Sequence, residues 1–146
     1  DPHTDSVVLV EQFRVGALDK SPKPWLLEIV AGLIDTDEEP AEVARREARE
    51  EADLELHELL PVMTYYPSPG GSDERVYLYV GRCSTAGAGG VFGVAEEGED
   101  IRVHVWPLAD ALKAVQDGRI DNAASIIALQ WLALNKEQVK ADWLRL

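Results

Sequence analysis

Short apolar blocks rich in β-branched residues alternate along this chain with longer stretches of helical periodicity. Residues 7–13 (VVLVEQF) and 25–31 (WLLEIVA) are two such blocks, and the segment 14–24 between them contains glycine and prolines. Both blocks therefore predict β-strands joined by a loop. Pro40 suits the first turn of a helix, where its missing N–H does no harm, and we expect that helix over residues 40–52.

The second half of the chain repeats the alternation of strands and helices. Its expected elements are strands at 59–66, 75–83 and 101–106, a Gly-rich and then acidic loop at 84–100, a helix opened by Pro107, and a last helix capped by Asp121 or Asn122. Helices between and after strands predict an α/β (α+β) sandwich, with a central mixed sheet and helices on its faces. A loop of about 17 residues inside a compact domain is usually functional or disordered.

Composition restricts the classes of partner. The chain has 146 residues, the size of one domain, and 46% of them are hydrophobic, enough to form a core. A net charge of −13 argues against a nucleic-acid partner, since phosphate backbones call for a basic surface. The single cysteine, Cys83, indicates a reducing, cytoplasmic compartment. No run of 18 apolar residues is present, so we expect no membrane partner.

The expected helix at 40–52 carries an acidic stripe. Glu47, Glu50 and Glu51 stand at i, i+3 and i+4, a spacing that brings side chains to one helix face. A hard divalent cation such as Mg²⁺ would relieve their mutual repulsion, because it prefers oxygen ligands. A solvated surface stripe is the alternative, and it would be the better interpretation of three glutamates alone. Alanines on the roughly opposite side predict the packed face of the helix: Ala41, Ala44, Ala48 and Ala52.

The residues around the stripe are more specific. Residues 32–54 resemble the Nudix box, G-x5-E-x7-R-E-U-x-E-E-x-G-U with U apolar, at eight of its nine specified positions. The matching residues are Gly32, Glu38, Arg46, Glu47, Ala48, Glu50, Glu51 and Leu54. Asp53 replaces the last glycine, and we expect it to adopt the left-handed conformation with a small stability cost. The resemblance implies a single Nudix hydrolase domain over residues 1–146, an α/β/α sandwich with a loop–helix–loop metal site.

The Nudix resemblance also implies roles for the box residues. Glu47 and Glu51 would be metal ligands, together with the backbone carbonyl of Ala31, and Glu50 would ligate the metal or orient a bound water. Arg46 would lie away from the metal and pair with Glu38, although without the box it would pass for a surface arginine. The implied cofactor is Mg²⁺, with Mn²⁺ as the alternative and two or more ions per site in turnover.

Two later segments resemble the bacterial ADP-ribose pyrophosphatase branch of the Nudix family. Pro69, 15 residues beyond Leu54, lies in YPSPGG, and residues 93–103 look like that branch's catalytic loop. In that loop one glutamate is the general base and another, two positions on, binds metal, which implies Glu97 as base and Glu99 as ligand. Glu96 is the rival to Glu97. Taken alone, an ordinary Pro-Gly turn and a solvated acidic loop would explain the two segments.

The same branch implies the substrate contacts. Arg14, which follows the first strand, would bind a phosphate, because a phosphoanhydride calls for a planar, permanently charged donor. The alternative for Arg14 is a solvent-exposed side chain at a strand end. The other implied contacts are the backbone of Leu33, then Ser68, Pro69 and Gly70, and Glu74 for a ribose hydroxyl.

We therefore expect a Mg²⁺-dependent pyrophosphatase that hydrolyses ADP-ribose, a small-molecule nucleotide sugar, to AMP and ribose 5-phosphate. The alternatives are a pyrophosphatase for another sugar nucleotide such as GDP-mannose, and a non-catalytic Nudix domain that senses a nucleotide. Members of this branch are homodimers that exchange a segment preceding the first strand. The chain begins Asp-Pro-His directly before a strand, so we expect that segment to be missing or removed.

Overall fold

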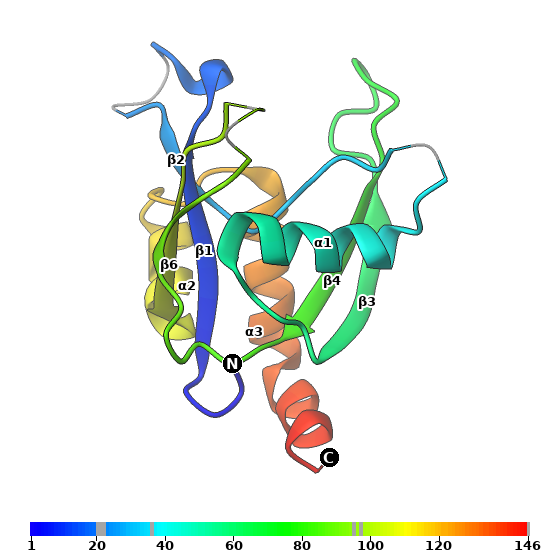
Figure 1. Cartoon of the computed structure of the whole chain (residues 1–146), viewed down its shortest axis with the longest axis vertical. Coiled ribbons are helices and arrows are strands. Elements are labelled where there is room, and N and C mark those ends of the chain that lie inside the picture. The colour runs from blue at the N-terminus through cyan, green and yellow to red at the C-terminus, as the bar shows by residue number, and fades with distance from the viewer. Residues whose placement is uncertain (20–22, 36, 95, 97, 146) are drawn as a thin grey trace.

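The computed structural model describes residues 1–19, 23–35, 37–94, 96 and 98–145 (Figure 1). The elements, in chain order, are β1 Ser6–Phe13, η1 Val15–Ala17, β2 Trp25–Glu28, α1 Pro40–Ala52, β3 Glu58–Tyr65, β4 Val76–Arg82, β5 Gly90–Phe92, β6 Ile101–Pro107, α2 Leu108–Gln116 and α3 Ala123–Leu144. The α/β character expected from the sequence is confirmed. Among these residues, no helix has the length and continuous apolar character needed to cross a membrane.

The β layer consists of two antiparallel sheets. One has the strand order β2-β1-β6-β5, and the other is the hairpin β3-β4. The expectation of one continuous mixed sheet is corrected in this respect, because the pairings between described strands are antiparallel. Apolar residues of β1 and β4, among them Leu9 and Leu78, line one cavity, and the described strands of the two sheets are not paired with each other.

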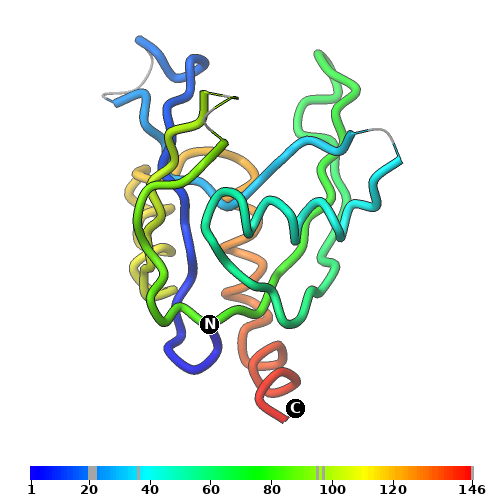
Figure 2. Tube along the Cα trace, viewed as in Figure 1, coloured from blue at the N-terminus to red at the C-terminus, as the bar shows by residue number. Residues whose placement is uncertain are grey.

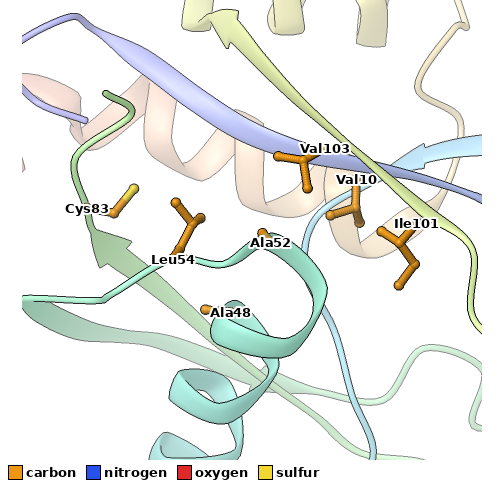
Figure 3. Packing of buried hydrophobic residues seen from close by; sticks show 7 residues of the cluster. All are labelled: Val10, Ala48, Ala52, Leu54, Cys83, Ile101 and Val103. Atoms are coloured by element: carbon orange, nitrogen blue, oxygen red, sulfur yellow. The ribbon is translucent and has the colours of Figure 1, made fainter. Parts of the chain in front are cut away.

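Helices cover both faces of the four-stranded sheet. Val10, Ile101 and Val103 pack with residues of α1 on one face, in the cluster drawn in Figure 3. Leu9, whose side chain points the other way because successive strand residues alternate, packs with Leu129 of α3 and with α2 on the opposite face. The sheet is therefore the middle layer of a sandwich. Cys83 is a free thiol that is buried in the cluster on the α1 side.

Helix α1 has the bounds that the sequence predicts. Pro40 occupies its first turn, and Asp53 ends it with φ 50° and ψ 41°, the left-handed conformation expected at this position. The amide of Leu54 donates to the Ala48 carbonyl and that of Asp53 to the Arg49 carbonyl, both at 3.0 Å. These bonds satisfy carbonyls that the helix end would otherwise leave free, which offsets part of the cost of a non-glycine residue there.

The packed face of α1 is wider than the alanine pattern indicates. Ala48 and Ala52 are buried as expected, but Glu47 and Glu51 are buried as well. Helix α1 lies between the two sheets and contacts β4, β5 and β6, so positions adjacent to the alanines are covered too (Figure 1). The acidic stripe is therefore divided: two glutamates face inward, and Glu50 remains exposed.

In the second half of the chain, the structure adds a short strand to the predicted loop and identifies the cap of the last helix. The predicted loop 84–100 contains the short strand β5, which pairs with β6. A three-residue edge strand that begins with glycine carries too little β pattern to be recognised. At the start of α3 the choice of cap is settled, since the side chain of Asn122 accepts a hydrogen bond from the Ser125 amide.

Candidate active site

The segment between β2 and α1 crosses from the four-stranded sheet to the far end of α1, as the trace in Figure 2 shows. It thereby runs past the glutamates of that helix. The Ala31 amide donates a 3.1 Å hydrogen bond to Oε2 of Glu51. Glu51 is 2% exposed, whereas most charged side chains remain in water. The backbone of residue 31, expected to be part of a metal site, is therefore in direct contact with one of the expected ligands.

The buried glutamates are in an unfavourable electrostatic environment. Burial raises the pKa of Glu51 to about 7, and the nearby Glu47 and Glu99 carboxylates also raise it, while the Ala31 amide lowers it. Burial likewise raises the pKa of Glu47; the charge of Arg46 opposes that shift, and Glu50 and Glu99 add to it. Carboxylates that cost free energy to ionise, and that repel one another, indicate a functional site.

Gly32 lies against the side chain of Glu47. A Cβ built at position 32 would collide with the carboxylate carbon, one carboxylate oxygen and Cγ of Glu47. The backbone at this glycine therefore leaves room for the glutamate to turn toward the 31–33 segment. The glycine of the box motif has a steric role that its sequence position alone does not reveal.

Arg46 is at the centre of the acidic group. Its Nε and Nη2 donate to the two oxygens of Glu38, each at 3.3 Å, so the expected pair with Glu38 is present. Its Nη1 also donates to Glu47 at 2.7 Å and to Glu50 at 3.0 Å. Arg46 therefore contacts two of the glutamates that are expected to bind the metal, and its expected position away from a bound metal stays a prediction. These carboxylates, with the Glu38 hydrogen bonds first, raise the pKa of Arg46 further above its usual range.

Glu99 is held by the turn between β5 and β6. The Val94 amide donates to Glu99 Oε2 at 2.9 Å. Gly93 has φ +108°, and a Cβ on it would stand 2.6 Å from Glu99 Cβ, so both its conformation and its lack of a side chain are needed. Glu96 is exposed. The expected base, Glu97, lies outside the described residues.

Arg14 is fixed by a partner in the neighbouring strand. Its Nε donates to Glu28 Oε2 at 2.9 Å, and Nη2 lies 2.8 Å from the same oxygen. Its side chain is 45% exposed, so part of the guanidinium faces solvent and remains available to an anion. Both interpretations of Arg14 from the sequence are thus compatible with its position.

A cavity of about 590 Å³ joins several of the predicted site residues. Its wall includes Ala31, Leu33 and Glu47 on one side and Glu74 on the hairpin side. Ser68, Pro69 and Gly70 are exposed at the hairpin turn beyond its lining. The volume lies within the range of small-molecule sites, about 300–1,000 Å³.

The donor set fits a hard divalent cation in its chemistry. Buried carboxylates with raised pKa values, among them Glu51, which accepts a hydrogen bond from the Ala31 amide, present negative charge that a cation would stabilise. Within the described ranges, no three carboxylate, histidine or cysteine side chains are grouped closely enough to hold one ion in this arrangement. Arg46 engages Glu47 and Glu50, two of the glutamates expected at the metal, in the same arrangement.

Gly32→Ala is expected to weaken divalent-cation binding by about 10- to 100-fold, as when the support of a metal ligand is lost. The new methyl group would displace the carboxylate of Glu47. Titration of the metal-free protein with Mn²⁺ measures the effect. Gly16→Ala is the matched control, since a Cβ there meets nothing within 4 Å. An affinity of Gly32→Ala equal to that of the control would contradict the steric role of Gly32.

Sequence reasoning did not identify two supporting residues. Glu28, which orients Arg14, ends a strand of apolar character; it lies opposite Val10 in the pairing of β1 with β2, and the Arg14 side chain reaches it from beyond the end of β1. Gly93 supports Glu99, and the signal available for it was a glycine just before the acidic loop. Neither position is distinguishable by residue type alone.

Comparison with known proteins agrees with this arrangement. The NUDIX domain family model matches residues 1–140. The chain therefore belongs to the Nudix family, which confirms the resemblance drawn from residues 32–54 and the expectation of an enzyme of this class.

Its relatives include named pyrophosphatases. The ADP-ribose pyrophosphatase of Escherichia coli K12 is 50% identical over 143 residues, which cover 98% of this chain and 68% of the relative. That of Haemophilus influenzae is 44% identical over 148 residues, covering 99% and 68%. The GDP-mannose pyrophosphatase of Cronobacter sakazakii is 37% identical over 130 residues, covering 88% and 67%. The chain is thus more similar to these ADP-ribose pyrophosphatases than to this GDP-mannose enzyme.

Proposed function

We propose that this protein hydrolyses the pyrophosphate bond of ADP-ribose, giving AMP and ribose 5-phosphate, with Mg²⁺ or Mn²⁺ as cofactor. The observation that carries the substrate assignment is the 50% identity to an ADP-ribose pyrophosphatase across 98% of the chain, against 37% across 88% for a GDP-mannose pyrophosphatase. The buried glutamates of α1 support the metal dependence.

The proposed chemistry is attack of water on one phosphorus. The water oxygen forms a bond to phosphorus, the bridging P–O bond breaks, and the bridging oxygen leaves with the departing phosphate. Divalent cations, when bound, neutralise phosphate charge and lower the pKa of water. Glu97 accepts the proton of the water, as a general base within about 3 Å of it.

The remaining residues bind the cation or the substrate in this proposal. Glu47, Glu51 and the Ala31 carbonyl would hold the metal, with Glu50 as ligand or water-orienting group and Glu99 as a further ligand. Arg14, already oriented by Glu28, would bind a phosphate through its exposed N–H groups. The proposed contacts to the rest of the substrate are the backbone of Leu33, the turn residues Ser68, Pro69 and Gly70, and Glu74.

Two alternatives make different predictions. A GDP-mannose enzyme would release GMP from GDP-mannose faster than AMP from ADP-ribose. A nucleotide sensor would bind one compound tightly without turnover; against it, each of the four box glutamates is present, and two of them, Glu47 and Glu51, are buried.

The experiment is a substrate panel with Mg²⁺: ADP-ribose, GDP-mannose and NADH, with AMP or GMP release followed over time. We expect kcat/KM for ADP-ribose to exceed that for GDP-mannose by at least about tenfold, equivalent to about 1.4 kcal/mol. Faster turnover of GDP-mannose, or tight binding with no turnover of any compound, would contradict the assignment. A matched reaction in EDTA should be inactive.

We further propose that residues 1–146 act as one catalytic domain in the cytoplasm and assemble as a homodimer. The single cysteine supports a reducing compartment. Sedimentation equilibrium would test the assembly.

A further inference from the structure

The guanidinium of Arg46 divides its hydrogen bonds between two groups of carboxylates. Nε and Nη2 hold Glu38, which lies in the segment before α1, at 3.3 Å. Nη1 alone contacts the helix glutamates, Glu47 at 2.7 Å and Glu50 at 3.0 Å. The shorter contacts are therefore made to residues that the proposed function assigns to the metal.

These contacts place a positive charge where a divalent cation would be needed. Glu47 is buried, and its other close neighbours in charge are the carboxylates Glu50 and Glu99, so Arg46 is its principal compensating group. Two cations competing for one pair of carboxylates repel each other strongly when partly shielded from water. In the arrangement that contains these contacts, the described carboxylates are not grouped to hold an ion.

We propose that Arg46 is an internal counter-cation that occupies Glu47 and Glu50 in the metal-free protein and releases them when a divalent cation binds, so that it sets the metal affinity. The proposal rests on the metal site of the proposed function. The division of the hydrogen bonds makes it feasible: Nε and Nη2 hold Glu38, so the carboxylates of Glu47 and Glu50 can turn from Nη1 to a cation while the planar guanidinium stays in place. The side chain of Arg46 is 35% exposed, so water can take the place of the two carboxylates at Nη1.

The opposing interpretation is that Arg46 only positions Glu47 and Glu50 for the metal. Arg46 uses one oxygen of each carboxylate, which leaves the second oxygen free for a cation. The two roles differ in sign. Removal of a competitor strengthens metal binding, whereas removal of a positioning group weakens metal binding. In both cases the metal-free protein becomes less stable.

The test is Mn²⁺ binding to the metal-free protein without substrate, followed by the electron paramagnetic resonance signal of free Mn²⁺. Arg46→Gln is expected to bind Mn²⁺ about tenfold more tightly than the wild type, and to have a lower Tm in EDTA. Arg49→Gln is the matched control, because Arg49 is exposed on the same helix and its loss removes the same charge. It should change the affinity by less than about twofold, as expected for an exposed charge that salt screens.

Arg46→Lys covers the case in which the glutamine variant fails to fold. A single ammonium group cannot hold three carboxylates in the geometry of the guanidinium fork, so the lysine variant should also bind Mn²⁺ more tightly than the wild type. Unchanged or weaker binding in whichever variant folds overturns the proposal. If the wild type itself binds no Mn²⁺, the proposed metal site is wrong as well. If the wild type binds Mn²⁺ and the variants do not bind it more tightly, only the proposed role of Arg46 is wrong.

Discussion

Glu51→Gln is expected to lower turnover by about 10³-fold, equivalent to about 4 kcal/mol of transition-state stabilisation, because a neutral amide replaces the charged carboxylate that we propose as a metal ligand. In EDTA at pH 8 the same change should stabilise the protein by about 1–3 kcal/mol, because it removes a charge that burial makes unfavourable. Activity with Mg²⁺ and thermal unfolding in EDTA measure the two effects. Opposite signs of this kind are typical of groups retained for function.

The stabilisation should depend on pH in a defined direction. The folded pKa of Glu51, about 7, lies above its unfolded value of 4.5, so the folded protein binds the extra proton between those values. The contribution of Glu51 to stability is thus fully present below pH 4.5 and is lost as pH rises through 7. The advantage of Glu51→Gln should shrink as pH falls from 8 to 5. Glu55→Gln, an exposed control just beyond α1, should show no such trend.

Glu97→Gln is expected to reduce kcat by about 10²- to 10⁴-fold, the usual loss for a general base, with little change in Mn²⁺ affinity. Steady-state kinetics with ADP-ribose, together with a Mn²⁺ titration, distinguish a general base from a metal ligand. A metal ligand, the role proposed for Glu99, should lose both kcat and Mn²⁺ affinity when it is replaced by glutamine.

Glu96→Gln distinguishes the two candidate bases. Glu96 is exposed, and in the same loop the Val94 amide donates a hydrogen bond to Glu99. If the base is Glu97, the change at 96 should leave kcat within about threefold of the wild type, as for a surface substitution away from the reacting atoms. Wild-type rates in Glu97→Gln would contradict the assignment of Glu97 as the base. A larger loss of kcat in Glu96→Gln than in Glu97→Gln would assign the base to Glu96 instead.

Local chemistry explains which parts of the fold could be predicted. Helix α1 is specified by Pro40 at its start and by its periodicity, and Asp53 accommodates the left-handed end. These signals lie within a few residues of the feature that they encode. The three-residue strand β5 has no such signal, because its pairing with β6 and not its composition defines it.

The candidate site divides in the same way. The motif located Glu47, Glu50 and Glu51, since residue type and spacing are written directly in the sequence. The burial of two of them depends on how α1 is covered by distant strands. Arg46 has several carboxylates nearby in the sequence, and their spacing does not indicate which of them it contacts. Its hydrogen bonds to Glu47 and Glu50 therefore became visible only in the structure.

The separation of the β layer into two sheets has a thermodynamic consequence. Helix α1 contacts strands of both sheets, and its glutamates meet the 31–33 segment that follows β2, while Glu74 reaches the same cavity from the β3–β4 hairpin. A ligand held at once by groups from both sides would tie the sheets together. Its binding free energy would then add to the free energy that holds the β3–β4 hairpin against the rest of the domain. Saturation with ligand should therefore raise the free energy of local unfolding of the hairpin.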